Sequence, residues 1–154
     1  MMKIRSAERI LTWRSQFHRL QRWFARLAPE EKITDIEKLD YYLAFFLNCY
    51  AMRDWLIQSR AISKADIDRL IFADDSMRLC RDICNRSKHL SLKDASFDAY
   101  FQISREYIHH DETTRWFIIA ASEKRDLWDL ASACMNFWLQ FLEAHPDLPE
   151  EPYP

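Results

Sequence analysis

The 154-residue chain contains no glycine. Walker A loops, dinucleotide fingerprints, EF-hand loops and nucleophile elbows all need glycine, where the backbone turns tightly or comes close to a phosphate. The absence of glycine therefore excludes these classes of site. It also disfavours a strand-rich fold with many tight turns, and it favours helices joined by proline, aspartate and serine.

Long apolar segments and paired metal-binding motifs are also missing. No apolar run could span a bilayer, and the N-terminus lacks the apolar core of a signal peptide. The cysteines Cys49, Cys80, Cys84 and Cys134 form no Cys-x-x-Cys knuckle, although the i,i+4 pair Cys80 and Cys84 leaves a metal site as an alternative. Each lies on an apolar helical face, which favours a buried small hydrophobe. We expect a soluble, cytoplasmic protein with no membrane partner, no metal and no cofactor.

Apolar and aromatic residues are abundant, at 49% and 14% of the chain, which predicts a single folded domain. The formal charge of −2 conceals a difference between the two ends of the chain. Residues 1–28 carry seven Lys and Arg residues against Glu8 alone, whereas residues 122–154 are acidic. The basic end has the character needed to attract an anionic partner, unless its arginines pair with the acidic end.

The periodicity of apolar residues predicts a mainly α fold. The first expected helix covers residues 4–27, and the second opens at Thr34 and ends near 59. The third is capped by Ser63 and ends at 72, and the fourth begins at 75 or 76. The last is capped by Ser122 and ends near 144. Alternating residues predict one β-hairpin, over 97–108 and 114–121. The prediction is a four- or five-helix bundle in residues 1–144, with the hairpin inserted before the C-terminal helix. Residues 145–154 hold four of the five prolines and are expected to form an extended tail.

The fourth expected helix carries an unusual polar face. At 100° per residue, its polar residues share one stripe roughly 120° wide. These residues are Arg78, Arg81, Asp82, Asn85, Lys88 and His89, and the opposite side holds Leu79, Cys80, Ile83, Cys84 and Ser87. Cations, an amide and an imidazole on one face could bind or cleave a phosphodiester. A structural hydrogen-bonding face would have the same composition.

Asn85 and His89 resemble the motif of the HEPN superfamily of helical domains. That motif is an arginine, a polar residue, three to five further residues and a histidine; in this chain Cys84 stands where the arginine is expected. The resemblance implies RNA or nucleotide binding in a bacterial defence or toxin–antitoxin setting, with a cognate antitoxin protein as a partner. Any activity would be that of a metal-independent RNase. His89 would then transfer the proton beside Asn85, and Arg81 would stabilise charge.

The chain is also similar to a group of small, largely uncharacterised bacterial proteins. They pair Asp-Trp late in a long helix with Asn-x-x-Lys-His in the next, followed by a hairpin and a Trp-containing C-terminal helix. The matching residues here are Asp54-Trp55, Asn85, Lys88-His89 and Trp138, within a similarity that spans roughly residues 35–143. This similarity implies an architecture more than an activity, and a possible loss of nuclease activity follows from Cys84.

Asp54 is the expected partner of the polar stripe. A carboxylate buried among Tyr50, Trp55 and Ile57 would need a cationic neighbour, which Arg81 or His89 could supply if the two helices pack together. Asp54 would then join Arg78 and Lys88 as a binding residue. The alternative is a surface Asp54 paired with Arg53 or Lys64. Two functions follow: an RNA- or nucleotide-binding module, or a non-enzymatic interaction module, a homodimer, whose polar motif is a structural hydrogen-bond network.

Overall fold

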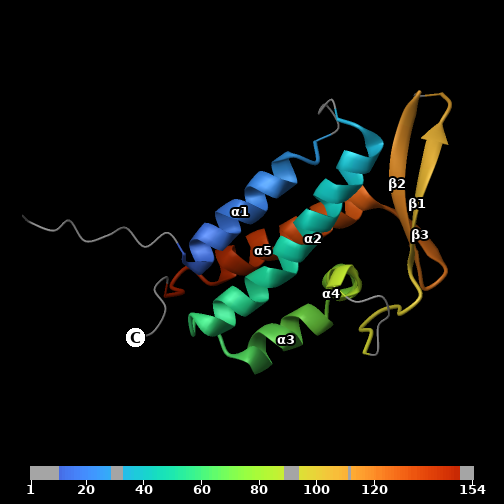
Figure 1. The fold of residues 1–154 in the computed structure, drawn as a ribbon. Coiled ribbons are helices and arrows are strands. Elements are labelled where there is room, and N and C mark those ends of the chain that lie inside the picture. The colour runs from blue at the N-terminus through green and yellow to red at the C-terminus, as the bar shows by residue number, and fades with distance from the viewer. Residues whose placement is uncertain (1–10, 29–32, 89–93, 111, 150–154) are drawn as a thin grey trace, which may run out of the picture.

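A computed structural model describes residues 11–28, 33–88, 94–110 and 112–149 of the chain. It confirms the mainly α prediction, with five helices and a three-stranded antiparallel sheet inserted before the last helix (Figure 1). The elements are α1 (Trp13–Ala25), α2 (Asp35–Gln58), α3 (Lys64–Phe72), α4 (Asp75–Lys88), β1 (Gln102–Ile108), β2 (Thr113–Ala120), β3 (Glu123–Asp126) and α5 (Leu127–Ala144).

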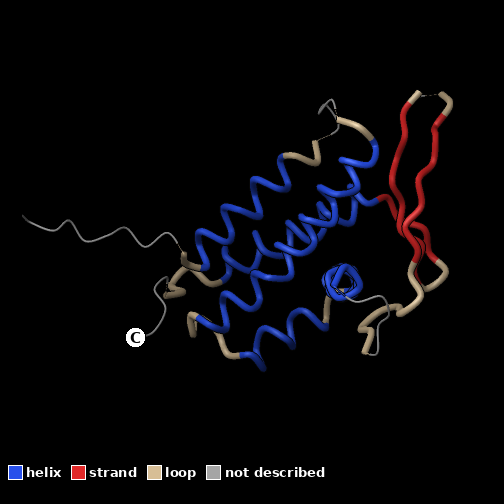
Figure 2. The backbone as a smooth tube through the Cα atoms, in the orientation of Figure 1, coloured by secondary structure: helices blue, strands red, loops and turns tan. Residues whose placement is uncertain are grey.

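The long helix α2 lies at the centre of the bundle. It packs against α1, α4 and α5, and α3 packs against α4. The sheet stands beside one end of the helices, where α5 contacts β2 and β3 (Figure 2). The largest fully buried side chains include Leu20 of α1, Phe45 and Phe46 of α2, and Trp138 of α5. These residues form one continuous core between the three helices.

Local capping explains where the helices begin. Thr34 and Ser63 accept hydrogen bonds from the backbone three residues later, which confirms both predicted starts. Asp74 Oδ1 accepts the Met77 N–H at 2.9 Å and caps α4, which begins at Asp75, one of the two predicted starts. The helix predicted over residues 4–27 begins at Trp13, behind a capping box at Thr12; residues 4–10 lie outside the described part of the chain.

The predicted hairpin is confirmed, and β3 extends it to a third strand. Ile103 of β1 lies opposite Ile118 of β2, and Ile119 lies opposite Lys124 of β3. The first strand begins at Gln102 rather than at 97. Residues 96–98 are not part of β1 because their backbone N–H groups bond to a side chain of α4.

The prediction that Ser122 caps the last helix was wrong. Ala121 and Ser122 have φ values of 50° and 65° and form a two-residue turn between β2 and β3. Such hairpin turns need positive φ at both positions, a role usually given to asparagine and glycine. Asp126 caps α5 instead, because its Oδ1 accepts the Trp128 N–H at 2.7 Å.

The segment after α5 returns to the start of the bundle. The indole Nε1 of Trp13 donates to the Pro149 carbonyl at 2.6 Å, and residues 150–154 of the predicted tail lie outside the described part of the chain. Among the described helices, none has the length and apolar character needed to cross a membrane.

Candidate functional site

The polar face of α4 centres on Asp82, a fully buried carboxylate. Its Oδ1 accepts the Ser96 N–H at 2.8 Å and the Ser96 hydroxyl at 3.1 Å. Its Oδ2 accepts the N–H groups of Phe97 at 2.7 Å and of Asp98 at 2.9 Å. Four donors from one irregular segment therefore satisfy a carboxylate whose burial would otherwise be unfavourable.

Two arginines of the stripe bind the same segment. Arg78 donates to the Ser96 carbonyl through Nε at 2.8 Å and also through Nη2, while the Ser96 hydroxyl donates to the Arg78 carbonyl at 2.8 Å. Arg81 donates to the Asp94 carbonyl at 2.8 Å, and its Nη1 lies 3.9 Å from Asp82 Oδ1. The predicted phosphate-binding guanidinium groups are thus bonded to backbone carbonyls.

Asp98 extends this network from α4 to the sheet. Its carboxylate accepts the Ala121 N–H at 2.9 Å and the Tyr100 N–H at 2.8 Å. These backbone hydrogen bonds, that of Ala121 first, lower the pKa of Asp98. Asp82 therefore holds the backbone of Asp98, and Asp98 holds the turn between β2 and β3. We name Arg78, Arg81, Asp82, Ser96 and Asp98 the α4 anchor.

The remaining stripe residues lie toward the C-terminal end of α4. Asn85 is half-buried and Lys88 is exposed, while the predicted catalytic His89 lies outside the described residues. Ser87 was expected on the core side, but it is exposed, and its hydroxyl donates to the Ile83 carbonyl of its own helix at 2.8 Å. The structure therefore brings Arg78, Arg81 and Asp82 together around one segment.

Asp54 lies at the protein surface, as the alternative prediction had it. Its side chain is 60% exposed and forms an ion pair with Arg53 at 2.7 Å. Arg53 also bonds to Asp68 at 2.5 Å, which joins α2 to α3. The expectation of a buried Asp54 was wrong, and the buried carboxylate of this region is Asp82.

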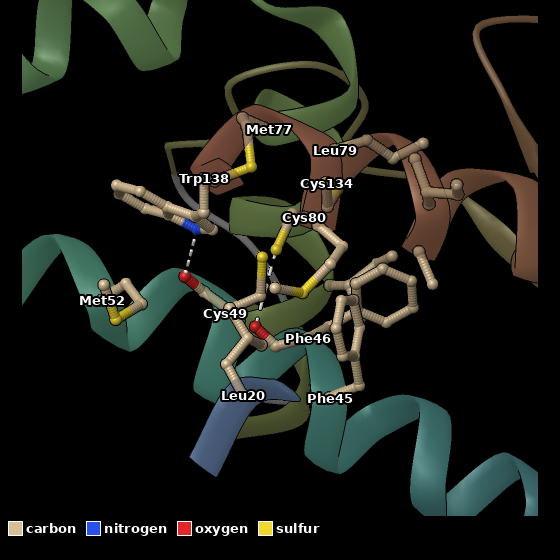
Figure 3. Close-up of a cluster of buried hydrophobic side chains, with 14 of the residues drawn as sticks. Leu20, Phe45, Phe46, Cys49, Met52, Met77, Leu79, Cys80, Cys134 and Trp138 are labelled. Carbon is tan, nitrogen blue, oxygen red and sulfur yellow. Dashed lines mark hydrogen bonds between the residues drawn. The ribbon is translucent and has the colours of Figure 1, made fainter. Parts of the chain in front are cut away.

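A second cluster was not expected from the sequence. Cys49, Cys80 and Cys134, from α2, α4 and α5, are fully buried, and their sulfur atoms all lie within 4.8 Å of one another (Figure 3). The cysteines are buried as predicted, but Cys80 lies beside the cysteines of two other helices. Of the described His, Cys, Asp and Glu residues, no other three come so close.

Hydrogen bonds fix the backbone around these thiols. Cys80 Sγ donates to the Phe46 carbonyl at 3.5 Å, and Cys134 Sγ donates to the Ser76 carbonyl at 3.4 Å. The indole of Trp138 donates to the Cys49 carbonyl at 2.9 Å. Burial raises the pKa of Cys80 and Cys134 well above that of an exposed thiol, so both are protonated at neutral pH.

A hollow of about 570 Å³ lies between the sheet and the bundle. Tyr42, Trp116 and Trp128 line it together with several charged residues. Two of its polar groups serve the fold: Lys38 donates to the Leu27 carbonyl at 2.7 Å, and Asp126 caps α5. The lining therefore combines aromatic rings with polar side chains, two of which already have partners within the protein.

Local signals in the sequence could identify the polar stripe but not its bonding partners. The donors to Asp82 lie 14 to 16 residues away, in a segment without periodicity. Comparison of the chain with family models, with curated proteins and with solved structures finds no match.

Proposed function

We propose that this protein is a non-enzymatic interaction module that pairs with a second copy of itself along the edge of β1. The observation that carries the non-enzymatic part of the proposal is the α4 anchor, and the edge of β1 carries the self-association. Arg78 and Arg81, the groups best suited to bind a phosphate, donate to the carbonyls of Ser96 and Asp94. Their role is then to hold the sheet on the bundle rather than to bind a nucleic acid.

The edge of β1 supports self-association. In the sheet order β1-β2-β3, β1 pairs only with β2, and no other described strand covers its outer edge. A seven-residue strand without proline offers backbone groups that a further strand can pair with. Ser104 is the third residue of this strand, and its Oγ is the one buried side-chain oxygen or nitrogen without a hydrogen-bond partner among the described residues. A second strand would give this hydroxyl a partner.

The sequence of β1 is self-complementary in one register. Antiparallel strands related by a two-fold axis through Ser104 place that serine opposite its own copy, on the same face of the extended sheet. Gln102 then lies opposite Glu106 of the second copy, whose carboxylate also pairs with Lys124 of its own sheet, so an amide donor meets a partly engaged carboxylate at two symmetric positions. Arg105 lies opposite Ile103, which keeps the two guanidinium groups apart. Such cross-strand hydrogen bonds stabilise pairing.

Sedimentation velocity over a range of concentrations tests this assembly. Gln102→Glu places a carboxylate opposite Glu106 of the second copy at both symmetric positions. Each such pair should weaken association by up to about 1 kcal/mol, so the dimer should weaken roughly tenfold. Adding Glu106→Gln restores a donor opposite each carboxylate and should restore the dimer. Glu123→Gln, on the opposite edge of the sheet, is the matched control. A wild-type chain that stays monomeric at every concentration contradicts the proposal.

RNA or nucleotide binding by Arg78, Arg81, Asn85, Lys88 and His89 stays a prediction, as does an antitoxin partner. A phosphate at Arg78 would have to displace the Ser96 carbonyl, and one at Arg81 would share the guanidinium group with the Asp94 carbonyl. Incubating wild type and His89→Ala with total RNA tests the nuclease hypothesis directly. Cleavage by wild type alone would support it and would contradict the non-enzymatic proposal.

A further inference from the structure

Three helices that are distant in sequence bring their thiols to one point in the core. Cys49, Cys80 and Cys134 each have 0% exposure, and the helices α2, α4 and α5 each contribute one of them. Figure 3 shows the sulfur atoms of Cys49 and Cys80 facing each other, with Cys134 beside them. Free cysteines often pack as small hydrophobes. Three cysteines whose sulfur atoms all lie within 4.8 Å of one another can also act together as the ligands of one ion.

The spacing of the sulfur atoms fits a three-coordinate ion. Bonds of about 2.3 Å to sulfur place three sulfurs about 4 Å apart around a planar ion and about 3.5 Å apart around a pyramidal one. From the observed upper limit of 4.8 Å, the sulfurs must move closer by at most about 1.3 Å, which small side-chain rotations supply.

The number of ligands argues against zinc. Structural zinc sites are tetrahedral, with four protein ligands, and catalytic ones complete the tetrahedron with water. Within the described ranges no histidine, carboxylate or further cysteine joins the three thiols. Their complete burial gives solvent no opening to the fourth position. The geometry therefore favours an ion that is satisfied by three sulfurs.

The net charge of the complex further limits which ions the three thiolates could hold. The side chains around the thiols are apolar: Leu20, Phe45, Phe46, Met52, Met77, Leu79 and Trp138 (Figure 3). Three thiolates around a monovalent ion leave a charge of −2, and those around a divalent ion leave −1. Uncompensated charge is unfavourable in such surroundings. A trivalent centre gives a neutral complex.

We propose that Cys49, Cys80 and Cys134 form a trithiolate site for a trivalent metalloid hydroxide, the class of arsenite and antimonite. Binding replaces three metalloid–oxygen bonds by three metalloid–sulfur bonds. Each thiol proton leaves with one hydroxide as water, so three waters are released and the oxidation state is unchanged. The neutral hydroxide enters when the helices open transiently, and the bound centre then joins α2, α4 and α5 covalently.

Native mass spectrometry of the reduced full-length chain with arsenite tests the site. The expected adduct gains one arsenic atom and loses three protons, whereas binding by two thiols would retain a hydroxyl group. Cys84→Ala is the matched control, because Cys84 is also buried and lies on the same helix as Cys80. It should leave the adduct intact, while Cys80→Ala and Cys134→Ala should each remove the three-proton adduct. Circular dichroism checks that each variant folds.

A second measurement keeps the proposal testable if an alanine variant does not fold. The arsenic-loaded wild type should melt at a higher temperature than the free chain, because the ligand binds only the folded site. An adduct that forms only in denaturant would overturn the proposal and leave the thiols as core packing. Tighter binding of Zn²⁺ than of arsenite at the same three cysteines would overturn the assignment to a trivalent centre.

Discussion

Asp82 and Phe97, fifteen residues apart, are joined by a 2.7 Å hydrogen bond from the Phe97 N–H to the buried Asp82 carboxylate. Together with the bonds from Ser96 and Asp98, it fixes the segment that leads from α4 into β1. One buried carboxylate of the bundle therefore holds the segment from which the sheet begins. Breaking such a site leaves several backbone donors without partners.

Replacing Asp82 by alanine should destabilise the protein strongly. Three backbone N–H groups lose their acceptor, while the Ser96 hydroxyl keeps the Arg78 carbonyl, and we expect the free energy of unfolding to fall by about 3 kcal/mol or more. Urea denaturation monitored by circular dichroism measures this change. Asp54→Ala is the control, since its exposed ion pair should contribute only about 0–1 kcal/mol. Equal effects of the two substitutions would contradict the assignment of Asp82 as the anchor.

Arg81→Ala should reduce stability without changing the affinity for RNA. The variant leaves the Asp94 carbonyl without its donor, which should lower the free energy of unfolding by about 1 kcal/mol. Fluorescence anisotropy with a labelled RNA at several salt concentrations measures the affinity. If wild type binds and Arg81→Ala makes the dependence on salt less steep, Arg81 contacts a phosphate and the structural assignment is wrong.

The contribution of Asp98 should depend on pH. Its folded pKa is lowered, so its stabilising effect is complete above the unfolded value near 4 and is lost as the pH falls through the lowered pKa. Asp98→Ala should therefore be less stable than wild type at pH 6, and the difference should shrink toward pH 2. Unfolding of both proteins across this range provides the measurement. A difference that does not change with pH would show that the charge of Asp98 is unimportant.

Ser122→Gly should stabilise the sheet. Ser122 has a φ of 65°, and left-handed backbone costs a non-glycine residue roughly 1–2 kcal/mol. Glycine removes most of this cost but adds unfolded-state entropy, so the net gain in the free energy of unfolding should be below about 1 kcal/mol. Ser132→Gly, inside α5, should instead destabilise by up to about 1 kcal/mol. A loss of stability from Ser122→Gly would contradict the strain argument.

Local sequence signals predicted most of the helices and the hairpin. Thr34 and Ser63 predict where their helices begin, because a capping side chain bonds to the backbone only three residues later. The four residues of β3, Glu123–Asp126, carry no apolar alternation, and they form a strand because β2 lies beside them. The anchoring role of Asp82 and the meeting of Cys49, Cys80 and Cys134 depend on tertiary contacts, which periodicity does not encode.

The span of these contacts along the chain has a consequence for folding order. The bonds of Asp82 close loops of 14 to 16 residues, whereas the bond from Trp138 to the Cys49 carbonyl joins residues 89 apart. Short loops cost less entropy to close than long ones. We therefore expect the start of the sheet to be held on α4 while the three thiols are still apart, and the cysteine cluster to assemble only when α5 docks.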